Sequence, residues 1–175
     1  MVRINNHETP VLQDLASRVP ENGLIFEIGA AFGYSATKMA DASHSSVKII
    51  TVDPWTLAPQ KQQPERERIF LEAVRAYSDR ILPVKSFSQD VDLAALLAGR
   101  EIDLLFIDGD HNYHGVSHDY LKFGDSVKSG GLLVFHDYVN ERWPGVARTV
   151  DELVVPSGKW VDYYDTHRFW VGTRR

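Results

Sequence analysis

Residues 24–35 read Leu24-Ile25-Phe26-Glu27-Ile28-Gly29-Ala30-Ala31-Phe32-Gly33-Tyr34-Ser35, and they indicate the class of fold. The first five are β-branched, aromatic or otherwise apolar apart from one glutamate, which is typical of a buried strand. Gly29 then allows a tight turn, and the residues from Ser35 onward have the apolar periodicity of a helix. A buried strand that passes through a glycine turn into a helix is the opening unit of a parallel α/β sheet.

The alternation of strand and helix patterns continues along the chain. Further strand-like runs are expected at 48–52, 81–84, 102–107 and 132–135. Helical patterns are expected at 11–18, 35–42, 66–77, 91–98, 116–123 and 146–154. Two aromatic-rich runs at 160–164 and 168–171 are typical of a hairpin. We therefore predict a Rossmann-like, doubly wound α/β sheet of seven strands, mostly parallel, with an antiparallel hairpin at the C-terminal end.

Composition narrows the class of protein further. The chain has 175 residues, of which 43% are hydrophobic and 25% charged, so we expect one globular domain over residues 1–175. The net charge of −5 and the lack of a Lys/Arg block speak against nucleic acid as a partner. The absence of cysteine excludes disulfides and thiolate metal sites. No apolar run approaches the ~20 residues that span a bilayer, and the first ten residues do not resemble a secretory signal. We expect a cytoplasmic protein with no membrane partner.

Ligands of doubly wound sheets bind beyond the carboxyl ends of the strands, so the turns that follow the strands carry the functional prediction. The first turn offers Gly29 and Gly33 at a helix entry, where backbone amides can meet a ligand, although an isolated pair of this kind also occurs as a purely structural turn. Asp53, at the end of the second strand, can accept both hydroxyls of a ribose. Its alternative role is a helix cap or Asx turn ahead of a proline. Trp55 can pack beside a nucleoside or act as a hydrophobic anchor.

The first turn favours S-adenosylmethionine over a dinucleotide. A dinucleotide fingerprint needs a second glycine that makes room for the pyrophosphate, and Ala31 stands in that place. Glu27 is poorly placed beside a pyrophosphate, whereas it attracts a ligand that carries an amine or a sulfonium.

Four segments, taken in order, resemble a known family: Glu27-Ile28-Gly29 with Gly33, Val52-Asp53, Phe106-Ile107-Asp108-Gly109-Asp110-His111, and Gly130-Gly131-Leu132-Leu133-Val134-Phe135-His136-Asp137-Tyr138. Together they are similar to class I S-adenosylmethionine-dependent methyltransferases. The resemblance is strongest to the small branch related to macrocin-type and other sugar or macrolide O-methyltransferases and to cephalosporin-hydroxylase-like proteins. It extends from about Leu24 to the end of the chain.

The resemblance implies methyl transfer to a hydroxyl of a small molecule such as a sugar or natural product. It also implies a set of cofactor-binding residues: Glu27, Gly29, Gly33 and Ser35 around the methionine part, Asp53 at the ribose, Ser88 with Phe87 or Trp55 at the adenine, and Asp108 below the methyl group.

Acidic and histidine residues follow the fourth and fifth strands and are expected to share one pocket wall: Asp108, Asp110, His111, His136 and Asp137. The alternative is a turn and helix cap with solvated histidines. The resemblance implies a divalent cation on Asp108, His136 and Asp137. The imidazole replaces a hard oxygen ligand, which disfavours Mg²⁺ and is accepted by Mn²⁺, Fe²⁺ or Zn²⁺. Asp110 or His111 is the expected base, and His136 is either a second base or a hydrogen-bond partner of the acceptor.

Two other functions are compatible with the same residues. One is a metal-dependent hydrolase or oxygenase-like enzyme built on Asp108, His136 and Asp137, and the other is a module that binds S-adenosylmethionine without turnover. The chain has no large insertion to cover an acceptor, so residues 1–20, 54–65 and 138–144 are the expected gates. A homo-oligomer is one way in which such gates are completed.

Overall fold

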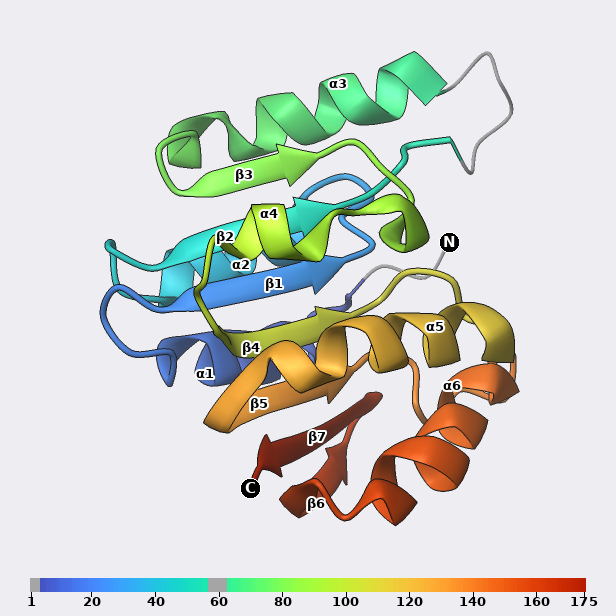
Figure 1. Cartoon of the computed structure of the whole chain (residues 1–175). Helices are drawn as coiled ribbons and strands as arrows, with labels where there is room; N and C mark the ends of the chain where they lie inside the picture. The colour runs from blue at the N-terminus through green and yellow to red at the C-terminus, as the bar shows by residue number, and fades with distance from the viewer. Residues whose placement is uncertain (1–3, 57–62) are drawn as a thin grey trace.

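The computed structural model describes residues 4–56 and 63–175 and contains a seven-stranded sheet (Figure 1). The strands lie in the order β3-β2-β1-β4-β5-β7-β6. Neighbours from β3 to β5 are parallel, while β7 is antiparallel to both β5 and β6. The strand bounds are β1 Leu24–Ile28, β2 Lys48–Val52, β3 Ile81–Val84, β4 Ile102–Ile107, β5 Val127–Phe135, β6 Trp160–Thr166 and β7 Phe169–Arg174. The predicted fold class is therefore confirmed.

Helices cover both faces of the sheet. The α-helices are α1 Thr9–Ser17, α2 Tyr34–Ala42, α3 Gln63–Val74, α4 Leu93–Leu97, α5 Tyr113–Phe123 and α6 Pro144–Thr149. Shorter 3₁₀ segments are η2 Arg75–Tyr77, η3 Ser88–Asp90, η4 Gly124–Ser126 and η6 Val155–Ser157, and η5 Val150–Val154 is a π-helical turn. One hydrophobic cluster joins α1, α2 and α3 to the sheet, and a second joins α4, α5, α6 and η5 to the opposite face.

The apolar run of β1 reflects this double cover. Ile25 belongs to the first cluster, and its neighbour Phe26 belongs to the second. Because successive side chains of a strand point to opposite faces, a strand that is covered on both sides is apolar at nearly every position. The single exception in β1 is the buried Glu27.

The structure differs from the sequence prediction mainly in the last third of the chain. Strand β5 begins at Val127, whereas the sequence predicted its start at residue 132. Residues 128–131 form a bulge between the pairs Ile102–Val127 and Leu104–Leu132, so the strand is irregular over the part that the prediction missed. Gly130 has a φ of 78°, which is not a strand conformation. The sequence of this segment therefore lacks the pattern from which a strand is predicted. The hairpin strands are also longer than expected, and the turn between them contains only His167 and Arg168.

The order of the strands places a topological switch between β1 and β4. The connections after β1 and β2 run to the α2 and α3 face, whereas those after β3, β4 and β5 run to the α5 face. The carboxyl ends of β1 and β4 therefore flank the point at which ligands bind in such sheets. Of the expected gates, residues 1–3 and 57–62 lie outside the described residues. Among the described helices none is long and apolar enough to cross a membrane.

Candidate functional site

A cavity of about 460 Å³ lies at the switch point, a size suited to a small-molecule ligand. Residues that follow β1, β2, β3, β4 and β5 all contribute to its wall. Those predicted from the sequence are Gly29, Asp53, Phe87, Ser88, Asp108, Asp110, His111 and Asp137. The structure thus collects most of the predicted site residues around one space.

The glycine turn brings β1 against the end of β4. Gly29 has a φ of 95°, and a Cβ atom at this position would lie 2.2 Å from the carbonyl oxygen of Asp108. No side chain fits at that distance, so glycine is required for the close approach. Gly33 has a φ of 79° and is the residue before α2, where it packs near Phe70 and does not line the cavity.

Glu27 lies beneath this turn rather than in the cavity wall. Its side chain is fully buried, and the hydroxyl of Ser35 donates a hydrogen bond to its carboxylate. Burial, together with the neighbouring carboxylates Asp108 and Asp53, raises the pKa of Glu27 to about 8 against the opposing effect of Ser35. Ser35 lines a second cavity of about 270 Å³, which shares Gly29 and Asp108 with the first. A positive ligand above Ser35 would favour ionisation of Glu27.

Asp53 holds the turn and also faces the cavity. Its Oδ2 accepts a hydrogen bond from the backbone N–H of Ala31 at 2.8 Å, and its Oδ1 accepts one from the N–H of Trp55 at 2.6 Å. The second bond is the Asx turn considered as an alternative role, so Asp53 has this structural part in addition to its place in the cavity wall.

Trp55 differs from the expectation that it lies beside the nucleoside. It is only 3% exposed and does not line either cavity; its indole N–H donates to the carbonyl oxygen of Ala31 at 2.8 Å, and its ring packs 4.9 Å from that of Phe70. Trp55 is therefore a hydrophobic anchor. Phe87, which is 43% exposed and lines the cavity, is the aromatic residue placed to cover a base.

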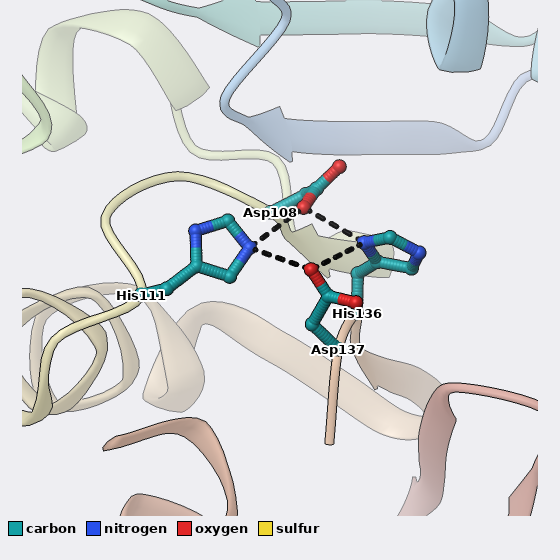
Figure 2. A group of neighbouring side chains, drawn as sticks. All are labelled: Asp108, His111, His136 and Asp137. Atoms are coloured by element: carbon teal, nitrogen blue, oxygen red, sulfur yellow. Dashed lines mark hydrogen bonds and ion pairs between the residues drawn. The ribbon is translucent and has the colours of Figure 1, made fainter. Parts of the chain in front are cut away.

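Four side chains converge at the other end of the cavity: Asp108, His111, His136 and Asp137. One potential ligand atom from each lies within 4.8 Å of all the others. Figure 2 shows the two imidazoles on opposite sides of the two carboxylates. Asp108 Oδ1 lies 3.0 Å from Nδ1 of His136 and 3.3 Å from Nε2 of His111. Asp137 Oδ2 lies 3.3 Å from the same Nε2 of His111 and 3.7 Å from Nδ1 of His136.

The electrostatics of this cluster follow from its crowding. Burial alone would lower the pKa of His136, but Asp108, Glu8 and Asp137 raise it to about 10. Burial likewise opposes protonation of His111, whose pKa is raised to about 9 by Asp108 and Asp137. Burial disfavours ionisation of both aspartates, yet the facing imidazoles hold their pKa values below the ordinary value.

The donor set fits a divalent cation. Nε2 of His111 is buried and close to two carboxylate oxygens, yet it makes no hydrogen bond of acceptable geometry. Two carboxylates and two imidazoles match the mixed N/O sets that Mn²⁺, Fe²⁺ and Zn²⁺ accept. The sequence had assigned His111 to catalysis alone, and the structure adds it to the three ligand candidates.

Asp110 does not join the cluster. It is exposed, its Oδ1 accepts a hydrogen bond from the backbone N–H of Asn112 at 3.0 Å, and the side-chain amide of Asn112 donates to its other oxygen. Asn112 in turn caps α5 through the N–H of Gly115. The turn-and-cap alternative therefore describes Asp110, although the residue still lines the cavity.

Two residues behind the cluster were not predicted. Glu8, only 1% exposed at the start of α1, has Oε2 at 3.5 Å from Nε2 of His136. Arg168, in the β6–β7 turn, lies 3.6 Å from Glu8 and 3.5 Å from Asp137. Both come from segments far from the cluster in sequence, and neither belongs to a motif that would have revealed it.

Comparisons with known proteins found a matching family model and a viral relative. A family model described as a methyltransferase domain matches residues 26–138. An uncharacterized protein of Acanthamoeba polyphaga mimivirus is 30% identical over 160 residues, which cover 87% of this chain and 70% of that protein.

Solved structures of low sequence identity share the fold. CalS11, a TDP-rhamnose 3'-O-methyltransferase of calicheamicin biosynthesis, has a TM-score of 0.69 at 15% identity, covering 97% of this chain and 81% of its own. An O-methyltransferase from Bacillus cereus in complex with SAH has a TM-score of 0.69 at 16% identity, covering 98% and 84% of the two chains.

Proposed function

This chain belongs to the methyltransferase domain family, and we propose from that premise that it transfers the methyl group of S-adenosylmethionine to a hydroxyl of a small molecule. Use of S-adenosylmethionine follows from the family. Oxygen as the accepting atom is supported by one observation above all, the convergence of Asp108, His111, His136 and Asp137 beside the cofactor cavity. A hydroxyl needs help in losing its proton, and this cluster has the groups for that task.

The cofactor is assigned to the residues that follow β1, β2 and β3. Gly29 and Ser35 meet the methionine part, with Glu27 and Gly33 shaping the turn from behind. Asp53 meets the ribose, and Phe87 and Ser88 meet the adenine. Asp108 borders both cavities and is therefore assigned to the space between the methyl donor and its acceptor.

Methyl transfer itself requires alignment and one proton movement. The acceptor oxygen attacks the methyl carbon as the carbon–sulfur bond breaks, so S-adenosylhomocysteine leaves and the hydroxyl proton must pass to a base. His111 is the best placed base once it has lost the proton that its raised pKa of about 9 retains at neutral pH, because it lines the cavity, faces Asp108 and Asp137, and packs 4.9 Å from Trp143 at the cavity wall. His136 is buried, and the hydrogen bond between its Nδ1 and Oδ1 of Asp108 orients that carboxylate. Asp110, which also lines the cavity, is the alternative base.

Asp108, His136 and Asp137 would hold a divalent cation, with His111 as a further ligand when it is not acting as the base. When bound, such an ion stabilises the developing oxyanion and offsets the negative charge that keeps the imidazoles protonated. The mixed donor set favours Mn²⁺, Fe²⁺ or Zn²⁺ over Mg²⁺.

For the acceptor we propose a sugar or another natural-product hydroxyl. The protein CalS11 is named for action on a TDP-linked sugar and shares the fold, which supports testing this class first. Trp143, 37% exposed at the cavity wall, offers an aromatic face of the kind on which a sugar ring stacks.

The experiment that tests the function begins with calorimetry. S-adenosylhomocysteine is expected to bind, and NADH and NADPH are not. Transfer of a labelled methyl group is then screened against sugars, catechols and macrolides with Mn²⁺, Fe²⁺, Zn²⁺, Mg²⁺ or excess chelator. Binding of a nicotinamide cofactor with no response to S-adenosylhomocysteine would refute the proposal.

The same screen separates the remaining alternatives. Cofactor binding with no transfer to any acceptor would favour a non-catalytic binding module, and hydrolysis or oxygen consumption without methyl transfer would favour the other enzyme class. Full activity in excess chelator, with no metal found by elemental analysis, would remove the ion and leave an acid-base and orienting set. His136→Ala should lower Mn²⁺ affinity, whereas the exposed His44→Ala, in the loop before β2, is the matched control.

A further inference from the structure

Helix α5 carries a buried carboxylate that the proposed mechanism does not use. Asp119 is 2% exposed, and its neighbours Val116, Tyr120 and Phe123 on the same helix belong to the hydrophobic core. A carboxylate is costly to bury without full hydrogen bonding, so its position needs a reason.

The position of Asp119 is in the wall of the cofactor cavity. It lines this cavity together with Ser88, Gly109 and Phe87, at the end assigned to the adenine. Gly109 is its neighbour in this wall, since a Cβ atom on this glycine would lie at an ordinary contact distance of 3.5 Å from Oδ2 of Asp119.

The hydrogen bonding of Asp119 is incomplete. The Ser88 side chain is close enough to lower the pKa of the carboxyl group, while Oδ1 is buried and has no hydrogen-bond partner. Lys122, one turn further along α5, directs its ammonium to the carbonyl oxygens of Ser88 and Gln89, at 2.9 and 2.7 Å. The nearby cation therefore fixes the η3 segment rather than pairing with the aspartate. Burial, reinforced by Asp110, raises the pKa of Asp119 to about 6 against the effects of Ser88 and Lys122.

We propose that Asp119 recognises the adenine base of the bound cofactor, with its carboxyl group accepting a hydrogen bond from the exocyclic amino group. This inference rests on the proposed function, since it requires that S-adenosylmethionine occupy the cavity. The edge of adenine presents an N–H donor, and Asp119 lines the cavity with a carboxyl group of which one oxygen has no partner. Phe87 lies along the same wall and covers a ring face, while Ser88 lies beside the carboxyl group.

The chemistry predicts discrimination between bases. Hypoxanthine presents a carbonyl oxygen in place of the amino group, so two acceptors would face one another at Asp119. A purine without any substituent at that carbon would leave the carboxyl oxygen unpaired. If Asp119 only positions Ser88, the preference of the protein for adenine over the other bases should not depend on the side chain at residue 119.

The test compares three ligands by calorimetry: S-adenosylhomocysteine, its hypoxanthine analogue and its unsubstituted purine analogue. The unaltered protein should prefer the adenine ligand over each analogue on the order of 10- to 100-fold, the worth of a hydrogen bond to a carboxylate. Asp119→Asn should bring the adenine-to-hypoxanthine ratio below about 3-fold, because a carboxamide can turn its N–H₂ toward a carbonyl oxygen.

Asp90→Asn is the matched control, since Asp90 is an exposed acid on η3 beside Ser88, and the ratio should not change. The ligand comparison on the unaltered protein needs no variant and stands even if Asp119→Asn folds poorly. Equal affinity of that protein for all three ligands would overturn the inference, as would a folded Asp119→Asn protein with an unchanged ratio. Failure of S-adenosylhomocysteine itself to bind would instead refute the proposed function.

Discussion

An aspartate lies at or just beyond each end of β4, buried at one end and half-buried at the other, and their surroundings differ. Asp103, near the amino end, accepts a hydrogen bond from the backbone N–H of Leu24 at 2.7 Å and forms an ion pair with Lys128. Asp108 follows the carboxyl end, where two imidazoles face it and both cavities border it. The charge at the amino end is matched within the fold, whereas the charges at the carboxyl end converge on a space that can admit a ligand.

This difference separates a structural carboxylate from a functional one. Both side chains are largely removed from water, so burial alone does not distinguish them. The two aspartates differ in the kind of group that contacts each of them. Around Asp103 they tie β1 and β5 to β4, and around Asp108 they are groups that can exchange protons or bind an ion.

The largest expected effect is on catalysis at the carboxyl end. Asp108→Asn keeps the shape of the side chain but removes the charge that both His111 and His136 face. We expect methyl transfer to fall by about 10²- to 10⁴-fold, the range for loss of a group that supports proton transfer. The measurement is turnover of labelled S-adenosylmethionine with an acceptor from the screen. Unfolding by urea serves as the control, and a folded variant with turnover within about threefold of the original would contradict a role for Asp108.

At the amino end the expected effect is on stability. Asp103→Ala leaves the buried N–H of Leu24 without its acceptor and Lys128 without its partner. The free energy of unfolding should fall by about 2 to 3 kcal/mol, because an unsatisfied buried donor retains its desolvation cost. Urea denaturation measures the change. Affinity for S-adenosylhomocysteine should stay constant.

Asp103→Asn sharpens this prediction. A carboxamide oxygen can still accept from Leu24, so the loss should be clearly smaller than for alanine. If both substitutions of Asp103 weakened cofactor binding in folded protein, the amino end would not be purely structural.

The sequence predicted the fold well where both faces of a strand are buried. Strands β1 to β4 have the predicted bounds, because their apolar runs end at turn residues. It failed at the start of β5, where Ser129 and Gly130 belong to a strand without strand-like side chains. Pairing with β4 holds this segment, and no local pattern reports a partner that is distant in sequence.

The candidate site, like the fold, was predictable from the sequence in most places but not in all. The carboxyl ends of β4 and β5 are adjacent, so Asp108, His111, His136 and Asp137 could be expected together. Glu8 could not, since it reaches His136 from a separate helix that precedes the sheet. Asp119 was missed for another reason: an acid on an amphipathic helix is usually solvated, and only the packing shows that this one is buried.

A smaller effect is expected at Asp53, which combines the properties of both ends of β4. It holds backbone N–H groups as Asp103 does, and it faces the cavity as Asp108 does. Asp53→Ala should weaken binding of S-adenosylhomocysteine by about 1.5 to 3 kcal/mol, the range for hydrogen bonds to a charged partner. Calorimetry provides the affinity, and circular dichroism checks the fold. Unchanged affinity in a folded variant would leave Asp53 with its structural part alone.

The effect expected to be smallest over any single pH unit is a pH dependence that originates in Glu27. Its carboxyl group has a pKa of about 8 in the fold, raised by burial from an ordinary 4.5, so between these values the folded state binds more protons than the unfolded state. Stability from this group is therefore fully present at low pH and is lost as the pH rises toward 8. Glu27→Gln retains an acceptor for Ser35 but cannot titrate. The original protein should lose stability relative to this variant by at most about 1.4 kcal/mol per pH unit, since one proton is involved. The imidazoles of His111 and His136 titrate in both proteins, so the difference between two urea series isolates Glu27. Parallel stability curves between about pH 5 and pH 8 would show that Glu27 is ionised beneath the turn despite its burial.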